Sequence, residues 1–191
     1  IASCLVGSEM CIRDRKTEHS EMVLKGTDIC KYHINPAKQY LRFEPEQFQQ
    51  VAPLEIYRAP EKLLYRFISN QLVVAYDDRQ MLSLNSCNIV IPKIEGMQIK
   101  YILAILNSSV SQFVYQKEFH SIKVLRAHME HIPIPRVGKA IQNEIIAMTE
   151  PLICGMGKEA AETCQKRLDC RIMDLFRLSA EEQWIIRHAL H

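Results

Sequence analysis

Side chains that donate hydrogen bonds to phosphate gather between residues 117 and 126 of this chain. Lysine and arginine neutralise phosphate charge whatever the base sequence, and an arginine in the major groove can also hold guanine through paired hydrogen bonds. Phosphate contact is expected first, because most protein–DNA hydrogen bonds go to the backbone. A solvated surface has the same composition, so both interpretations stay open. The predicted DNA-binding residues here are Lys117, His120, Ser121, Lys123 and Arg126.

Three histidines in the same region, His120, His128 and His131, raise the question of a metal site. His128 and His131 lie three residues apart, but no cysteine or carboxylate stands at a usual zinc spacing from them. Such a site needs three or four convergent ligands, so we expect no metal ion. Cys164 and Cys170 are too far apart for a Cys-x-x-Cys pair and are expected in a helix core or boundary.

The elements that would position these donors begin with three strand-like segments at residues 64–69, 72–77 and 81–91. They are rich in β-branched and aromatic residues and are separated by short polar turns, which predicts a three-stranded antiparallel meander. Residues 72–77 are nearly all apolar, so that strand is expected to be central and covered on both faces. Arg66 and Asn85 occupy alternating polar positions on the other strands and join the predicted DNA-binding residues.

A helix is predicted over residues 98–119, where apolar residues recur with the spacing of one helix face. We expect it to pack on the sheet, with residues 107–109 forming a packing notch in its middle. Residues 121–131 also have a spacing that permits a helix, which would put Lys123 and Arg126 on one face. The sequence therefore predicts an α+β fold, with an antiparallel meander and a packed amphipathic helix.

The flanking segments complete this expectation. Four prolines between residues 36 and 60 predict a loop-rich entry, with a strand and turn at 23–29, a strand at 39–43 and a helical turn at 44–50. After residue 136, helical spacing predicts a C-terminal helical region, with one helix that ends near 155–157, a second over about 158–177 and a last helix opened by a capping box at 179–182. This region is either a cap on the core or a hairpin that faces a partner.

Six short sequences stand out between residues 25 and 136: Tyr65-Arg66-Phe67-Ile68-Ser69, Ala75-Tyr76-Asp77, Leu84-Asn85-Ser86, Leu106-Asn107-Ser108, Lys123-Val124-Leu125-Arg126 and Ile132-Pro133-Ile134-Pro135. Through these sequences the region resembles the TaqI-like C-terminal specificity domain. In that family the domain is the DNA target-recognition module of adenine-N6 methyltransferases and of fused restriction-methylation enzymes. The resemblance implies that the chain binds double-stranded DNA as part of a restriction-modification enzyme.

The resemblance also implies what the chain lacks. Family methyltransferases carry an Asn-Pro-Pro-aromatic motif and a glycine-rich S-adenosylmethionine loop in an N-terminal domain. Asn35-Pro36-Ala37-Lys38 shares two letters with the first, and Gly155-Met156-Gly157-Lys158 follows a helix rather than a strand. We therefore expect binding without catalysis, no catalytic or cofactor-binding residue, and S-adenosylmethionine only in the parent enzyme, whose methyltransferase domain would lie in cis. The alternative is a stand-alone specificity subunit whose C-terminal helices bind a separate methyltransferase.

Composition sets wider limits on these interpretations. The chain has 191 residues, 48% hydrophobic and 24% charged, as expected for an ordinary domain with room for a core. The net charge is +2, with 15 Lys or Arg against 12 Asp or Glu in residues 16–136, so the positive excess is weak. No apolar run could span a membrane. Seven scattered cysteines favour reduced thiols and a cytoplasmic location.

Three parts are expected along the chain. Residues 1–15 resemble translated sequencing-adapter read-through, or else form a disordered tail, and either origin predicts little packing there. Residues 16–136 form the predicted DNA target-recognition domain. Residues 137–191 form the C-terminal helical region.

Overall fold

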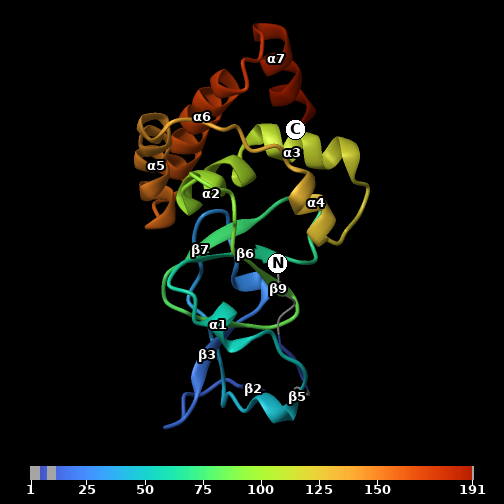
Figure 1. Ribbon diagram of the computed structural model, residues 1–191, viewed down its shortest axis with the longest axis vertical. Coiled ribbons are helices and arrows are strands. Elements are labelled where there is room, and N and C mark those ends of the chain that lie inside the picture. Colours follow the sequence, from blue (N-terminus) through green and yellow to red (C-terminus); the bar gives the residue numbers. More distant parts are fainter. Residues whose placement is uncertain (1–4, 8–11, 191) are drawn as a thin grey trace.

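A three-stranded antiparallel sheet crosses the middle of the molecule, with helices on one side and sheets of short strands on the other (Figure 1). The structure is a computed structural model that describes residues 5–7 and 12–190. The strand order is β7 (Val74–Asp77), β6 (Lys62–Arg66), β9 (Cys87–Val90), and both outer strands pair antiparallel with β6. The predicted α+β fold is confirmed, with antiparallel sheets and a helical C-terminal region.

The order within this sheet differs from the predicted meander. The central strand is β6, and residues 72–77 lie at an edge instead. The segment 81–91 is divided, because β8 (Leu82–Ser83) pairs in parallel with β3 (Glu21–Leu24) in another sheet before the chain turns back into β9. Coverage of both faces of residues 74–77 is confirmed, since every residue of β7 is buried.

Alternation along the strands divides the sheet between two hydrophobic cores. Leu63 and Tyr65 of β6 face the core that the helices complete, whereas Leu64 faces the core formed with the N-terminal strands. The neighbouring strand follows the same rule, with Val74 in the first core and Ala75 in the second. Each face of the sheet thus packs against a different hydrophobic core.

The N-terminal half forms the second core from short elements. A four-stranded sheet has the order β2 (Ile12–Arg13), β4 (Gln39–Leu41), β3, β8, and β1 (Val6–Gly7) pairs with β5 (Phe48–Gln50). The predicted strand and turn at 23–29 are confirmed as β3 and η2 (Gly26–Asp28), and the predicted strand at 39–43 as β4. The remaining elements are the short helices η3 (Pro45–Gln47) and α1 (Leu54–Tyr57).

Within the described part of residues 1–15, residues 13–15 are exposed, whereas Leu5 departs from the expected lack of packing. Leu5 is only 1% exposed, and its backbone bonds with Ser83 and Asn85. The rest of that prediction falls on residues 1–4 and 8–11, which lie outside the described residues.

Residues 98–119 form two helices rather than the single one predicted. These are α2 (Ile99–Asn107) and α3 (Ser109–Glu118), and the backbone of Ser108 between them is extended (φ −68°, ψ 158°). The Ser108 hydroxyl accepts a hydrogen bond from the Ser111 amide at 3.3 Å, so it caps a new helix instead of continuing the old one.

Asn107 packs against the sheet as predicted, but it does so at the break between two helices and not in the middle of one. The Asn107 side chain accepts from Val74 N (3.1 Å) and donates to Val74 O (2.8 Å). Gln112 makes the same pair of bonds with Leu72, at 3.0 and 2.8 Å. Two side-chain amides thus pair with the backbone of Leu72 and Val74 as a further strand would, and they give both buried N–H groups an acceptor. The Val74 carbonyl also accepts from Tyr32 N (2.7 Å).

Three helices form the predicted C-terminal region: α5 (Lys139–Ile153), α6 (Lys158–Leu175) and α7 (Ala180–Ala189). Together with α2 and α3 they make the helical end of the molecule (Figure 1). The capping box before α7 is confirmed, since Ser179 Oγ accepts from Glu182 N and the Glu182 carboxylate accepts from Ser179 N. No helix in the described ranges is long and apolar enough to cross a membrane.

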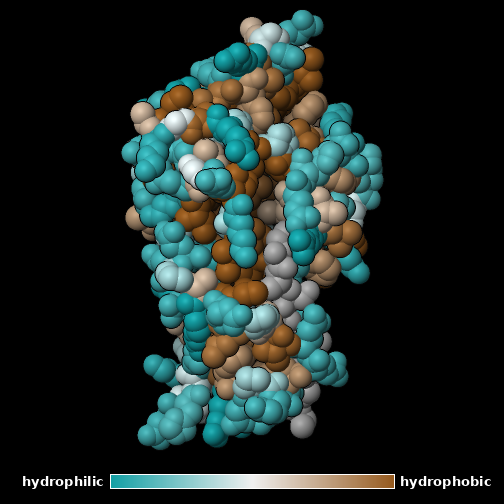
Figure 2. Space-filling model, viewed as in Figure 1, coloured by the Kyte–Doolittle hydropathy of each residue, from teal (hydrophilic) through white to brown (hydrophobic). Residues whose placement is uncertain are grey.

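The surface is polar at the flanks and at the strand-rich end. Figure 2 shows these regions in teal, with a brown apolar band down the middle of this face. Between β9, α2 and α4 (Arg126–His131) lies a cleft of about 460 Å³, lined by Val90, Ile94, Ile102, Leu106, Met129 and Ile132 among others.

Candidate nucleic-acid interface

The predicted DNA-binding segment joins the end of the central strand. Residues 67–69 continue beyond β6 and pair antiparallel with residues 122–124; we call these two segments the ribbon. Two backbone bonds hold it, from Ser69 N to Ile122 O (2.9 Å) and from Val124 N to Phe67 O (2.8 Å). Ile68 and Lys123 lie opposite each other between these bonds.

The ribbon is anchored to the helical core. Val124 is 1% exposed, so the ribbon is fixed by a buried side chain. The Ser121 hydroxyl accepts from Lys123 N (3.0 Å) and donates to Lys123 O (3.1 Å), which closes a turn around Ile122. The buried Tyr115 donates its hydroxyl hydrogen bond to Ser121 O (3.4 Å). Ser121, a predicted DNA-binding residue, therefore stabilises the start of the second ribbon segment through its bonds with Lys123.

These bonds correct the predicted helix over residues 121–131. Only Arg126–His131, the helix α4, is helical, because the backbone of residues 122–124 is committed to the ribbon. Lys123 is exposed on the ribbon, and Arg126 is the first residue of α4, so they do not share a helix face. The Arg126 side chain is 66% exposed and pairs with Glu130 at 2.7 Å. An exposed ion pair contributes at most about 1 kcal/mol, so Arg126 can exchange Glu130 for a phosphate.

Lys117 and His120 lie on the connection that leads into the ribbon. Lys117 is exposed in the last turn of α3, with its ammonium 5.6 Å from the centre of the Phe113 ring. His120 is exposed just beyond this helix. Four predicted donors are thus exposed on the segment that runs from the end of α3 to the start of α4: Lys117, His120, Lys123 and Arg126. Their contact with DNA remains a prediction.

Arg66 is held by the backbone of the N-terminal half. Its guanidinium donates to Gly26 O (3.0 Å) and Ile29 O (2.6 Å), and the side chain is half-buried. In this position it joins the end of β6 to the η2 turn. A role for Arg66 in DNA contact remains a prediction.

Asn85 is exposed in the turn between β8 and β9, beside the ribbon. The next residue, Ser86, accepts from Phe67 N (3.0 Å) through its carbonyl and from Gly26 N (3.0 Å) through its hydroxyl. Gly26 is required here, since a Cβ would lie 2.6 Å from Ser86 O. The turn that carries Asn85 is therefore fixed against the ribbon, and its DNA contact also remains a prediction.

His128 and His131 pack against Phe119 and do not face a common metal position. The His128 ring stacks on Phe119 with centroids 4.1 Å apart, and its Nδ1 accepts from Leu125 N (3.2 Å) at the start of α4. His131 meets the edge of Phe119 at 5.6 Å. In the part of the chain that the structure describes, no group of three or more histidine, cysteine, aspartate or glutamate residues could hold a metal ion.

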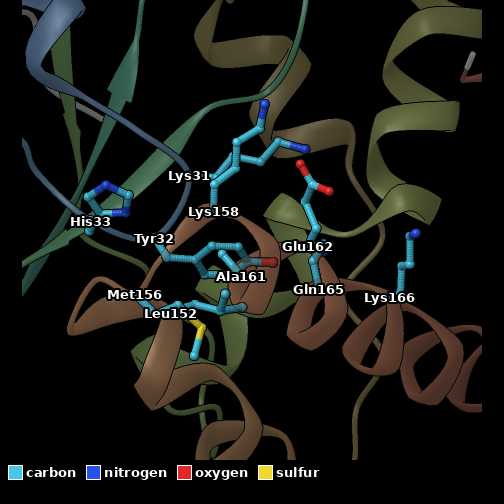
Figure 3. A pocket seen from close by; sticks show the side chains of 10 residues that line it. All are labelled: Lys31, Tyr32, His33, Leu152, Met156, Lys158, Ala161, Glu162, Gln165 and Lys166. Carbon is cyan, nitrogen blue, oxygen red and sulfur yellow. The ribbon is translucent and has the colours of Figure 1, made fainter.

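A second candidate surface is a cleft of about 770 Å³ where residues 31–33 meet α5 and α6 (Figure 3). Lys31, Lys158 and Lys166 line it, but so does Glu162, and Asp169 lies beside Lys31. Burial lowers the pKa of Lys31, and the Asp169 charge opposes that change. The segment 117–130 has a similar balance, with Lys117, Lys123 and Arg126 against Glu118 and Glu130, so charge alone does not separate the two surfaces.

Tyr32 forms the floor of this cleft and is 2% exposed. Its φ of 72° is unusual for a residue with a side chain, and its backbone exchanges hydrogen bonds with Val74 and Tyr76. Burial, with Asp169 second, raises the pKa of the hydroxyl. The nearby Gln165 side chain lowers the pKa of both Tyr32 and Asp169, against the effect of burial. Its buried Nε2 makes no hydrogen bond of normal geometry with the described residues.

The TaqI-like C-terminal specificity domain matches residues 21–134 of this chain. The chain belongs to this family. The match covers both segments of the ribbon and the turn that carries Asn85. The resemblance found in the short motifs is confirmed. No curated protein matches the chain.

The specificity domain is also similar to solved structures, with 25 matching chains. One is the Type IIL restriction-modification enzyme MmeI in complex with DNA, with a TM-score of 0.60 and 10% sequence identity. The similarity covers 97% of this chain, so it includes the helices beyond residue 134, and 35% of the MmeI chain. At this identity the comparison shows a shared fold. The chain spans about a third of the length of that enzyme.

Sequence reasoning missed the ribbon partner of Lys123 in this specificity domain. Ile68 belongs to one of the short motifs, but no local pattern joins residues so far apart. It also missed Lys31, Lys158 and Lys166, which only the tertiary fold brings to one cleft. The alternation that continues from β6 through Ile68 was the one available signal for the ribbon.

Proposed function

We propose that this chain is the DNA target-recognition domain of a restriction-modification adenine-N6 methyltransferase, with or without a fused endonuclease. The observation that carries the proposal is its membership of the specificity-domain family over residues 21–134. The geometry supports it, because the matched region carries a rigid ribbon with an exposed lysine, flanked by Lys117, His120 and Arg126. Such a surface can neutralise phosphates and present side chains to a groove.

We infer that the catalytic half lies outside this chain. The parent enzyme would flip the target adenine and transfer a methyl group from S-adenosylmethionine, while this domain holds the duplex. The absence of an Asn-Pro-Pro-aromatic motif supports this division, as does the 35% share of the MmeI chain that it covers. We propose a methyltransferase domain in cis, a cytoplasmic location, and a functional boundary between the recognition domain (16–136) and the helical region (137–191).

The test is DNA binding by the whole chain at several salt concentrations. Each phosphate contact that a substitution removes reduces the slope of log K against log salt by about 0.9. The double variant Lys123→Ala, Arg126→Ala should therefore bind a mixed-sequence duplex more weakly, with a slope smaller by about one to two. Its free energy of unfolding should stay within about 0.5 kcal/mol of the parent, since both side chains are exposed.

The matched control is Lys139→Ala, Arg167→Ala, which removes the same charge from exposed positions on α5 and α6. Its salt slope should equal that of the parent. Equal slopes for both double variants would show that the ribbon does not bind phosphate. No binding by the folded parent chain at low salt would refute DNA recognition itself.

A further inference from the structure

Exposed apolar side chains gather at the ribbon. Ile68 is 58% exposed, Ile122 is 70% exposed and Leu125 is 44% exposed. Single exposed hydrophobic residues are ordinary on protein surfaces. These three, however, surround Lys123 on an element whose backbone is fixed by two interstrand bonds.

The pairing decides which of these side chains share a face. Ile68 and Lys123 form a pair without mutual backbone bonds, because the flanking residues make the two interstrand bonds. In such a pair the two side chains project from the same face, close together. Leu125 is also extended (φ −86°, ψ 161°) and follows Lys123 by two residues, so alternation places it on that face. Ile122 belongs to the other face, with the buried Val124.

One exposed face of the ribbon thus carries Lys123 between two apolar side chains, Ile68 and Leu125. A two-stranded ribbon fits the major groove of B-DNA, which is about 12 Å wide. The floor of that groove has a matching alternation, because thymine presents a methyl group beside its O4 acceptor and guanine presents O6 and N7. The minor groove offers no methyl groups. An apolar protein partner would instead be opposed by the charges of Lys123 and Arg126.

We propose that this ribbon enters the major groove and that Ile68 and Leu125 contact thymine methyl groups there. Lys123, between them, reaches an acceptor on a base edge or a phosphate. The inference rests on the proposed function and deepens it, since it names the reading element and one class of base that it recognises. Rigidity supports this role, because Ser121, Val124 and Ser86 fix both segments of the ribbon before any DNA is bound.

The experiment begins with a random-sequence duplex pool from which the chain selects its preferred site by repeated binding. The selected duplex is then made in two forms, one with thymine and one with uracil at every thymine position. Uracil lacks the methyl group and keeps the hydrogen-bonding edge. The parent chain should bind the uracil duplex about fourfold more weakly for each methyl group that the ribbon buries.

The variants locate the effect on the ribbon. In Ile68→Ala, Leu125→Ala the ratio between the two duplexes should fall towards one, whereas Ile122→Ala, on the other face, should keep the parent ratio. Equal binding of both duplexes by the parent, or a selected site without thymine, would overturn the inference while DNA recognition stands. A parent ratio that persists in the double variant would overturn it too. Failure of the parent to select or bind any duplex would refute the proposed function.

Discussion

At the scale of single residues, one ion pair lies completely buried in the central sheet. Lys62 and Asp77 are opposite each other on β6 and β7, 2.6 Å apart, with both side chains fully buried. Lys62 also donates to Tyr57 O (2.7 Å), and Asp77 accepts from Arg79 N (2.9 Å) and Met81 N (3.0 Å). An aspartate at this point of the sequence predicts a turn, and Asp77 does close one. No local pattern indicates its buried partner.

Removing the lysine alone should be costly. Lys62→Met leaves the Asp77 carboxylate buried without its counter-charge, and such changes destabilise proteins by about 3–5 kcal/mol. Adding Asp77→Asn should recover part of this loss, since the neutral amide keeps an oxygen for the turn. Urea unfolding measures each free energy, with the exposed Lys38→Met as the control. A destabilisation below about 1 kcal/mol in Lys62→Met would contradict this account of the pair.

Buried tyrosines should make the fold sensitive to alkali. Tyr101 is fully buried and donates to Pro135 O (2.8 Å), and burial raises its pKa to about 12. In the unfolded chain a tyrosine loses its proton near pH 10. The free energy of unfolding should thus be undiminished below about pH 10 and fall between about pH 10 and 12.

Burial also raises the pKa values of Tyr32, Tyr76 and Tyr115. Tyr101→Phe should therefore reduce the loss of stability at high pH without abolishing it. The measurement is urea unfolding at about pH 8, 10 and 12. A free energy of unfolding that did not change over this range would show that these hydroxyls are not protected by the fold.

At the scale of elements, the junction of α2 and α3 should stabilise the edge of the sheet. Asn107→Leu leaves the N–H group of Val74 buried without a partner, at about 1–3 kcal/mol, whereas the Val74 carbonyl keeps its bond from Tyr32 N (2.7 Å). The loss should appear in urea unfolding and in faster hydrogen exchange of the Val74 amide. Gln116→Leu, half-buried on α3, is the control. If both variants were equally stable and Val74 stayed protected, the strand edge would not depend on this side chain.

The same junction shows what a sequence can and cannot reveal. The residues of the break, 107–109, were recognisable as poor helix formers, but a serine hydroxyl can bond back to the preceding turn or cap the next one. The helices beyond residue 136 were predictable because their spacing and the Ser179 capping box are local. The order of the central sheet and the pairing of Lys123 with Ile68 were not, since both depend on which distant strands meet.

At the scale of the whole molecule, the helical region and the recognition domain share one core. Ile145 of α5, Ile172 of α6 and Ile186 of α7 lie in the same hydrophobic cluster as the strands β6 and β7. Side-chain hydrogen bonds join the parts as well. Gln142 accepts from the backbone N–H at position 98 (2.8 Å) and donates to the carbonyl at position 96 (2.9 Å), and Asp169 accepts from the N–H at position 109 (2.8 Å). The helices therefore cap the core.

A partner-facing role for α7 is compatible with this arrangement. Trp184 is 58% exposed and Ile185 is 43% exposed, and the Trp184 ring stacks on His188 with centroids 4.1 Å apart. The cap is formed by the opposite side of the helix, through Ile186. The two interpretations of the C-terminal region thus apply to different faces of the same element.

The shared core predicts that residues 16–136 do not fold alone. Six buried side chains of the helical region complete the core, and burying each contributes about 1.5–3 kcal/mol, so together they contribute about 9–18 kcal/mol. This is as large as the net stability of an ordinary domain, about 5–15 kcal/mol. They are Ile145, Leu152, Leu168, Ile172, Met173 and Ile186.

A chain that ends at Arg136 should therefore lose its cooperative thermal transition, measured by circular dichroism. A chain that ends at Arg177 removes only Ile186 of the six and should keep the transition at a lower midpoint. A sharp transition in the chain that ends at Arg136, with salt-dependent DNA binding, would instead make the recognition domain independent of the helical region. The helices would then be free to act as a spacer or a docking surface, because the core would not need them.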